Sequence, residues 1–208
     1  MDIQKELQEN KDKENNKKSS EKLTAGFGIC GSFCTFSKIL PIIGDLTKDW
    51  NIIPIFSENA ANIDTRFAAA ADFEKEVEKI TDNKPINNIK DAEPIGPKKL
   101  LDVLVIAPCT GNTAAKIAGG IADTPVTLAV KSQLRNNRPV IIGISTNDGL
   151  GANAVNIGKL MTRKNIYLVP FGQDDFVNKE NSLVADFSLI KDTVESALKG
   201  KQLQPILI

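Results

Sequence analysis

The sequence predicts an α/β protein whose core is a doubly wound parallel sheet of the Rossmann or flavodoxin kind. Short apolar runs, of the length of buried strands, alternate five times with helix-length segments along the chain. The runs at residues 101–107 and 139–144 are almost wholly apolar, as expected of parallel strands whose two faces are both covered by helices. Such an alternation is typical of a parallel sheet with helices on both sides.

The individual elements follow from the spacing of the apolar residues. Strands are predicted at residues 23–29, 51–56, 101–107, 139–144 and 166–169. Helices are predicted at residues 36–48, 67–80, 112–121, 125–134, 152–161 and 183–198. With 208 residues the chain is long enough for one sizeable core, so residues 23–208 are expected to form one domain. Residues 1–22 are polar and bury too little apolar surface to offset their ordering entropy, which predicts a mobile tail.

Charge and composition exclude several classes of function. Lysine plus arginine equals aspartate plus glutamate, at 26 each, so no electrostatic footprint for nucleic acid or an anionic membrane is expected. The apolar runs are far shorter than the roughly 20 residues that cross a bilayer, and the charged N-terminal segment lacks the pattern of a secretory signal. We therefore expect a cytoplasmic protein whose partner is a small molecule or another protein.

The absence of histidine is the most restrictive feature of the composition. With no histidine among 208 residues, every Ser-His, Cys-His and His-metal mechanism built from this chain alone is excluded. Carboxylates and thiolates do not cluster in the sequence either, so no metal site is expected. Proton transfer must then use another side chain, a cofactor or a second subunit, and Asp148 and Glu58 are the candidates for accepting a proton if burial raises their pKa.

Small polar residues follow each predicted strand, at the edge of the sheet where ligands bind in doubly wound folds. Hydroxyl groups and free backbone N–H groups at helix N-termini suit a phosphate without a cationic side chain. The same residue types also favour plain turns and helix caps, and both interpretations stay open for any one loop. The expected ligand-binding residues are Gly31, Ser32, Thr35, Ser57, Thr110, Asn112, Thr113, Ser145 and Asn147.

Gly26, Gly28 and Gly31 match the G-x-G-x-x-G pattern of dinucleotide-binding turns. A true fingerprint must follow a strand, whereas the apolar alternation here runs straight through Gly26 and Gly28. We therefore place the first two glycines inside the first strand, with Gly31 and Ser32 forming the turn after it. Binding of NAD at this turn is the less favoured alternative.

The cysteines and arginines complete the set of reactive or charged candidates. Cys30 and Cys34 straddle the first turn with a spacing that does not favour a disulfide, and a helix N-terminus near Cys109 suggests a lowered pKa for that thiol. Arg66, near the end of the second strand, is the arginine best placed to bind a carboxylate of a small substrate.

Residues 107–123, which read APCTGNTAAKIAGGIAD, resemble the A-P-x-x-x-N-T-x-x-K-x-A-x-G-x-x-D signature of flavoproteins of the phosphopantothenoylcysteine decarboxylase type. The resemblance implies that this loop cradles FMN, that its asparagine and threonine contact bound ligands, and that a homotrimer is the building block. The catalytic histidine of those decarboxylases is missing, and GISTND at residues 143–148 replaces their P-A-M-N motif. Both departures argue against decarboxylation by the family mechanism.

Further stretches resemble one branch of this superfamily, the B subunits of dipicolinate synthase. They include DTRF at residues 64–67, AEPIGP at 92–97, LRNNRP at 134–139 and PFGQDD at 170–175. The resemblance implies the oxidation of dihydrodipicolinate to dipicolinate during sporulation, together with an A subunit that holds a nicotinamide cofactor. Two alternatives are a stand-alone FMN-dependent decarboxylase or reductase, and a noncatalytic subunit that binds and activates its partner.

Overall fold

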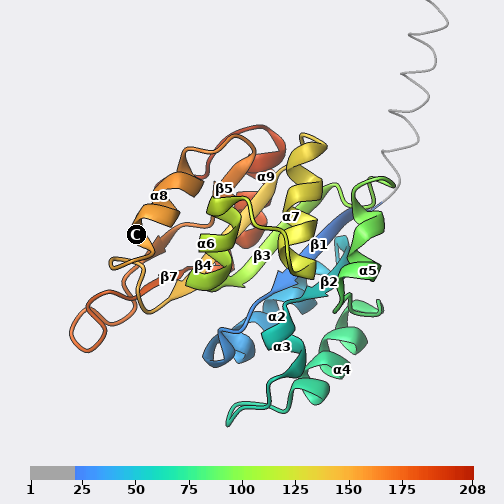
Figure 1. The fold of residues 1–208 in the computed structure, drawn as a ribbon, viewed down its shortest axis with the longest axis horizontal. Helices are drawn as coiled ribbons and strands as arrows, with labels where there is room; N and C mark the ends of the chain where they lie inside the picture. Colours follow the sequence, from blue (N-terminus) through green and yellow to red (C-terminus); the bar gives the residue numbers. More distant parts are fainter. Residues whose placement is uncertain (1–21) are drawn as a thin grey trace, which may run out of the picture.

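A computed structural model of the chain describes residues 22–208. Strands and helices alternate as far as the fifth strand, after which a short hairpin precedes the last helix (Figure 1). The strands are β1 Leu23–Ile29, β2 Trp50–Phe56, β3 Val103–Cys109, β4 Val140–Thr146, β5 Ile166–Leu168, β6 Phe171–Gly172 and β7 Leu183–Ala185. The helices are α2 Phe36–Leu46, α3 Glu58–Asn62, α4 Ala70–Thr81, α5 Ile89–Ala92, α6 Gly111–Gly119, α7 Pro125–Arg135, α8 Ala154–Met161 and α9 Ile190–Leu198, with 3₁₀ turns at Phe33–Thr35, Glu93–Ile95 and Phe187–Leu189.

The sheet has the order β2-β1-β3-β4 in its parallel part. Beyond β4 its edge is shared, because β5 pairs in parallel with Val140 to Ile142 while β7 pairs antiparallel with Ser145 and Thr146. From β1 the chain moves to one side for β2 and then crosses to the other side for β3. This reversal is the topological switch point, and ligands bind outside the carboxyl ends of the strands there.

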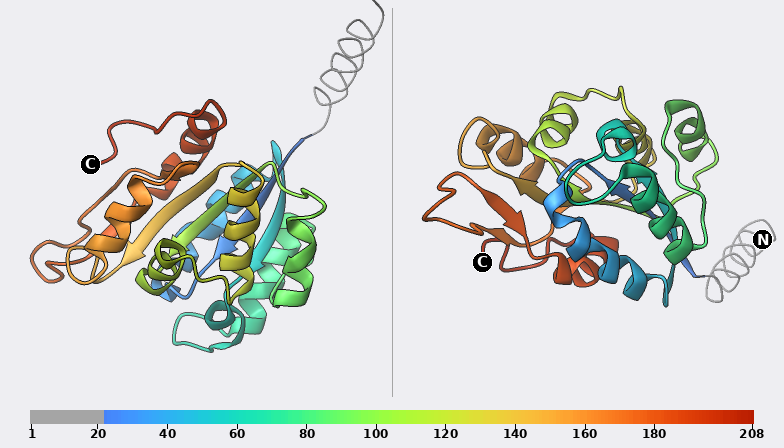
Figure 2. Two further views of the ribbon diagram at one scale, coloured as in Figure 1. Left: turned by 45° about the horizontal axis from the view of Figure 1, so that its top comes forward. Right: turned by 90° about the horizontal axis from the view of Figure 1, so that it is seen from below.

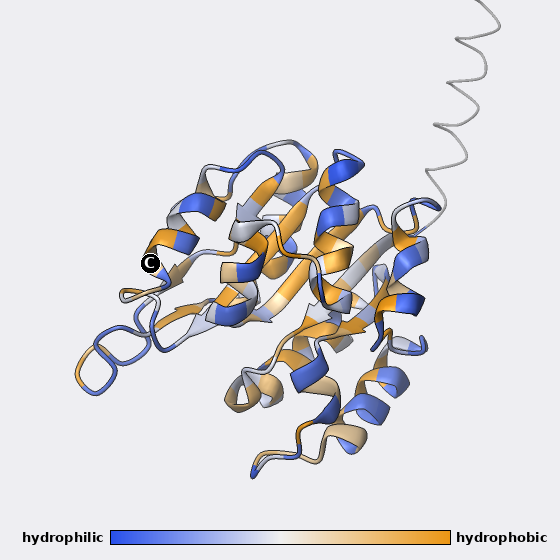
Figure 3. Cartoon of the chain, in the orientation of Figure 1, coloured by the Kyte–Doolittle hydropathy of each residue, from blue (hydrophilic) through white to orange (hydrophobic). Residues whose placement is uncertain are grey.

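Helices cover both faces of the sheet. Helices α6, α7 and α8 lie on one face, and α2 and α9 lie on the other (Figure 2). The central strands are apolar along most of their length, whereas the outward sides of the helices carry hydrophilic residues (Figure 3). Every residue of β3 is buried, which explains why its sequence is a continuous apolar run rather than an alternating one.

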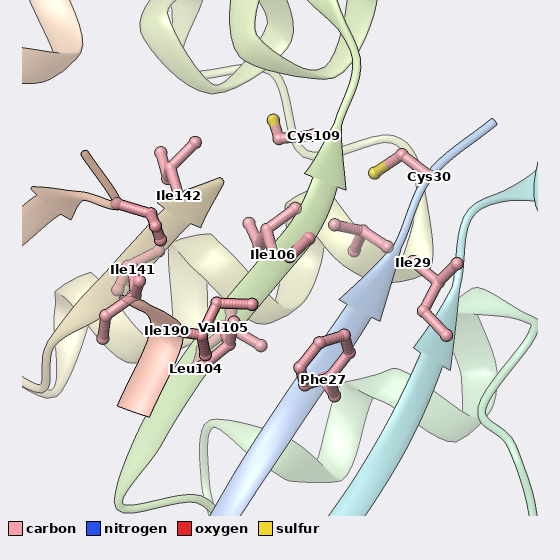
Figure 4. Packing of buried hydrophobic residues seen from close by; sticks show 14 of the residues in the cluster. Phe27, Ile29, Cys30, Leu104, Val105, Ile106, Cys109, Ile141, Ile142 and Ile190 are labelled. Atoms are coloured by element: carbon pink, nitrogen blue, oxygen red, sulfur yellow. The ribbon is translucent and has the colours of Figure 1, made fainter. Parts of the chain in front are cut away.

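The core lies between the sheet and these helices. Phe27 of β1, Val105 of β3 and Ile141 of β4 are in register and fully buried on the face that α9 covers with Ile190, whereas Ile106 lies on the opposite face (Figure 4). Gly26 and Gly28 lie within β1 and pair with both neighbouring strands, as the apolar alternation predicted. An ideal Cβ on Gly26 would lie 2.5 Å from Leu101, so the strand needs a glycine there for close packing. These glycines therefore form no dinucleotide-binding turn.

The doubly wound parallel sheet is confirmed, and β1 has the predicted bounds. The single helix predicted at residues 183–198 is wrong, because its first residues form β7 and a 3₁₀ turn before α9 begins at Ile190. The helix predicted from Phe67 begins at Ala70 instead, after Asp64 accepts a hydrogen bond from the N–H of that alanine. The short helices α3 and α5 were not predicted. Apart from Lys22, the tail predicted at residues 1–22 lies outside the described residues.

Within residues 22–208, none of the helices is long and apolar enough to cross a membrane.

Candidate functional site

A cleft of about 1160 Å³ opens at the carboxyl ends of β1, β3 and β4, at the switch point of the sheet. Its walls come from the loops after these strands, the first turns of α2, α6 and α8, and the segment between β6 and β7. Eight of the predicted site residues line it: Gly31, Ser32, Thr35, Thr110, Asn112, Ser145, Asn147 and Asp148. The sheet topology thus gathers into one cleft residues that are more than 100 positions apart in the sequence.

The loop after β1 forms one wall and is joined to the end of β4. The hydroxyl oxygens of Ser32 and Ser145 lie 2.8 Å apart in a hydrogen bond across the intervening strand β3. Thr35 donates its hydroxyl to the Ser32 carbonyl oxygen over 2.7 Å, which closes the turn. An ideal Cβ on Gly31 would lie 3.2 Å from Cβ of Asn59, so a side chain there would press on the neighbouring loop. This wall presents hydroxyl and backbone groups to the cleft.

The N-terminus of α6 forms the floor between β3 and β4. Thr110 caps the helix by accepting a hydrogen bond from the N–H of Thr113 over 3.3 Å. Gly111 and Asn112, in the first turn, line the cleft. The first N–H groups of a helix have no intrahelical acceptor, and with the helix dipole they favour a negatively charged group.

Asp148 lies against this first turn and is held by a network of hydrogen bonds. Its carboxylate accepts a bond of 2.6 Å from the Thr146 hydroxyl and bonds of 2.9 and 2.8 Å from the side-chain amide of Asn153. An ideal Cβ on Gly111 would lie 2.4 Å from that amide nitrogen and 2.9 Å from the Asp148 carboxylate. A glycine at the start of α6 is therefore what lets this network approach the helix end.

Four predicted site residues lie outside the lining of the cleft. Ser57 caps α3 by accepting a hydrogen bond from the N–H of Ala60, and Glu58 is exposed in the first turn of that helix. Thr113 is buried beneath Thr110. The Arg66 guanidinium stacks on the ring of its neighbour Phe67 at 4.9 Å from the centroid. These side chains cap, pack or face solvent in this structure.

Several residues that line the cleft were not predicted from the sequence. They include the aromatic rings of Phe33 and Phe67, the lysines Lys38 and Lys179, and Asn153 at the start of α8. Asn153 carries a detectable signal, because it directly precedes a helix and asparagine is a common cap. The sequence gives no such signal for Lys179, because a lysine in a polar loop is indistinguishable from any other solvated lysine.

The three cysteines, all within the described residues, are free thiols in different environments. Cys30 and Cys109 are buried at the carboxyl ends of β1 and β3 (Figure 4). Burial raises the pKa of the Cys30 thiol to about 11. Burial and the neighbouring Cys30 also raise the pKa of the Cys109 thiol, so the expectation of a lowered value was wrong. Cys34 is exposed and lines the cleft.

Residues 22–208 contain no group of three or more histidine, cysteine or acidic side chains arranged to hold a metal ion.

The strand order and the cleft at the switch point define a flavodoxin-like α/β protein. The sequence matches the family model described as Flavoprotein over residues 13–175. The dipicolinate synthase B subunit from Bacillus subtilis (strain 168) is 47% identical over 184 residues, which cover 88% of this chain and 92% of that protein. The chain therefore belongs to the Flavoprotein family and, within it, to the family of dipicolinate synthase B subunits.

Solved structures agree with this membership. The crystal structure of the dipicolinate synthase B subunit from Bacillus halodurans C has a TM-score of 0.82 and 43% identity, and the match covers 89% of this chain and 96% of that one. Burkholderia xenovorans DmrB in complex with FMN has a TM-score of 0.65 at 18% identity, with 86% and 97% of the two chains covered. At this lower identity the likeness to DmrB shows the shared fold alone.

Proposed function

We propose that this chain is the B component of a dipicolinate synthase, which acts with an A subunit to oxidise dihydrodipicolinate to dipicolinate during sporulation. The 47% identity to the Bacillus subtilis protein carries this proposal, because it extends over 88% of this chain and 92% of that protein. The reaction removes two hydrogens from a dihydropyridine ring, one as a proton and one with the electron pair. It yields an aromatic dicarboxylate.

The residues of the cleft suit FMN as a cofactor. The Ser32 hydroxyl and the N-terminus of α6 suit a phosphate, and Phe33 and Phe67 offer aromatic faces for a planar ring. The volume of about 1160 Å³ exceeds the roughly 300–1,000 Å³ typical of a site for one small molecule, which leaves room for a substrate beside the cofactor. When bound, FMN supplies an acceptor for the electron pair that leaves the substrate.

The chain's own side chains would position the substrate and take up the proton. Of the two candidate proton acceptors, Asp148 lines the cleft and Glu58 does not. Thr146 and Asn153 fix the Asp148 carboxylate at the end of β4, so the acceptor is held in place before the substrate binds. In this proposal Asp148 receives the ring proton, and the nicotinamide expected on the A subunit carries the electrons away.

The test is steady-state formation of dipicolinate, followed by its ultraviolet absorbance, with each subunit alone and with both mixed at varied ratios. We expect activity only in the mixture, with saturation at a fixed ratio, because few acid or base groups line the cleft. Equal activity of the isolated chain and the mixture would instead support the stand-alone enzyme.

Two asparagine variants separate a catalytic subunit from a noncatalytic one. Asn112 is exposed in the cleft, so Asn112→Leu should reduce the activity of the mixture by about tenfold or more by removing a polar contact and filling space. Asn87→Leu, at an exposed position away from the cleft, is the matched control and should leave the activity unchanged. Full activity of the Asn112 variant would mean that the chain only activates its partner.

A further inference from the structure

A dicarboxylate substrate needs a cation in the cleft, and two lysines provide the positive charges among the described residues that line it. They are Lys38 of α2 and Lys179, in the segment between β6 and β7. Arg66, the residue that sequence reasoning favoured for this role, does not line the cleft and stacks on Phe67 instead. The side chain that binds a substrate carboxylate is therefore expected to be one of these two lysines.

The two lysines lie at different ends of the cleft. Lys38 is in the first turn of α2, next to the loop that suits a phosphate, residues 31–35. Lys179 comes from the far side of the sheet, since strands β3 and β4 lie between β1 and β7. It also borders an adjoining depression of about 410 Å³ that includes Asn147. A ligand whose phosphate lies near Lys38 leaves Lys179 for the substrate.

The backbone around Lys179 is tied to the turn after β4. The N–H of Lys179 donates to the Asp175 carbonyl oxygen over 2.8 Å, and its own carbonyl oxygen accepts from the N–H of Ser182 over 2.9 Å. Next in the chain, the Asn181 carbonyl oxygen accepts a bond of 3.0 Å from the N–H of Leu150, just beyond Asp148. These bonds place the lysine beside the residues proposed to meet the substrate ring.

Lys179 forms only a weak, partly exposed ion pair with Asp174. Its ammonium group lies 3.4 Å from the Asp174 carboxylate, and the two side chains remain 55% and 34% exposed. An exposed ion pair of this kind contributes little to stability, so the ammonium can exchange one carboxylate for another at small cost. A dianionic ligand in the cleft offers it that second carboxylate.

We propose that Lys179 binds one carboxylate of the substrate in exchange for Asp174 and so selects dicarboxylates over monocarboxylates. This inference rests on the proposed function and deepens it. Lys179 acts in binding and in selectivity, and it takes no part in moving the proton or the electrons. Asp174 acts as an internal competitor for the same ammonium group.

The experiment measures the affinity of the FMN-saturated chain for pyridine-2,6-dicarboxylate and for pyridine-2-carboxylate by calorimetry. Lys179→Gln should weaken dicarboxylate binding by about tenfold or more, the value of a charged hydrogen bond, and should abolish the preference for two carboxylates. Asp174→Asn should tighten dicarboxylate binding, because it releases the lysine and removes a like charge. Opposite effects of two changes in one loop would exclude a general disturbance of that loop.

Two further variants complete the test. Lys90→Gln, at an exposed position in α5, is the matched control and should leave both affinities unchanged. Arg66→Gln tests the rival cation and should also have little effect. If Arg66→Gln removes the preference and Lys179→Gln does not, the assignment to Lys179 is overturned.

The outcomes for the inference and for the proposed function are separable. Normal dipicolinate formation by the mixture of the two proteins, with an unchanged KM in Lys179→Gln, would overturn the role of Lys179 and leave the proposed function standing. A mixture that does not act on dihydrodipicolinate, together with a chain that shows no preference for the dicarboxylate, would overturn both.

Discussion

The parallel strands β1, β3 and β4 and the hairpin of β6 and β7 are parts of one sheet, but they differ in how far they are paired and buried. Every residue of β3 is buried, and its neighbours pair with it in parallel on both sides. Strand β7 has three residues, of which two pair with β4, and its connection to β6 carries Phe176 and Val177 at 71% and 70% exposure. That connection is the loop at the lower left of Figure 1.

The two regions differ in their roles: the parallel strands support the cleft, and the hairpin supplies a wall that meets the ligand. The parallel strands are held by apolar burial and fix where the loops of the cleft begin. Strands β6 and β7 add Phe171, Leu183 and Ala185 to the core, whereas the connection between them is held mainly by polar contacts, such as the 2.8 Å bond from the Gln173 amide to the Glu180 carbonyl oxygen. A segment with few buried apolar contacts opens at low cost, and this suits a wall that must admit a ligand.

The largest difference between the two regions should appear in matched valine truncations. Val105→Ala, at a fully buried position of β3, should lower the free energy of unfolding by about 2 to 3 kcal/mol through lost burial and a cavity. Val184→Ala, at a partly exposed position of β7, should cost less than about 1 kcal/mol. Denaturant unfolding measures both values, and equal losses would show that Val184 is as tightly packed as Val105.

An intermediate effect is expected where the hairpin rests on the turn after β4. An ideal Cβ on Gly149 would lie 2.7 to 2.8 Å from three carbon atoms of Leu183, the first residue of β7. Gly149→Ala should therefore displace β7 and cost about 1 to 2 kcal/mol by overpacking. Hydrogen exchange should show faster exchange in residues 171–185 and unchanged protection in β1 and β3.

The control for this change is Gly158→Ala in α8, where an added Cβ meets no atom within 4 Å among the described residues. It should stabilise the chain by about 0.5 to 1 kcal/mol, because alanine is the better helix former. Loss of protection throughout β1 and β3 in the Gly149 variant would mean that the two regions unfold together.

The smallest effect should be a loosening of the hairpin in acid. The N–H and side chain of Asn178 hold the pKa of Asp175 below its usual range. Partial burial opposes ionisation of Asp174, but hydrogen bonds from Ser182 and Lys179 outweigh it and lower the pKa of that carboxyl as well. A carboxyl with a lowered folded pKa stabilises the fold above its unfolded pKa, and this contribution disappears as the pH falls through the folded value.

The hairpin should therefore gain mobility below about pH 4, the range in which aspartates become protonated. Proteolysis by an acid-active protease, at pH 5 and at pH 3, measures this change. Cleavage within residues 173–182 should precede cleavage elsewhere in the described chain. Asp175→Asn should already be susceptible at pH 5, and equal cleavage rates at both pH values would remove the role of these carboxyls.

The positions of the elements in the parallel part were predictable from local patterns. An alternating or continuous apolar run can be buried in only one way in an α/β sheet, so β1, β3 and β4 follow from their sequences alone. The loop residues after these strands were predictable for the same reason. Ser32, Asn112 and Asn147 were therefore expected in one site, and they line one cleft. Parallel strands bring their carboxyl ends to the same edge, whatever their separation in the chain.

The hairpin and the charged groups of the cleft were not predictable in this way. Residues 183–185 form a strand only because the end of β4 offers a free edge to pair with, and the same residues had matched the helical spacing of α9. The sequence by itself determined the parallel sheet, its glycine-containing first strand and the polar loops at its edge. Tertiary structure alone decided that Arg66 lies outside the cleft while Lys179 lines it, because the direction of a loop side chain depends on packing between segments far apart in the chain.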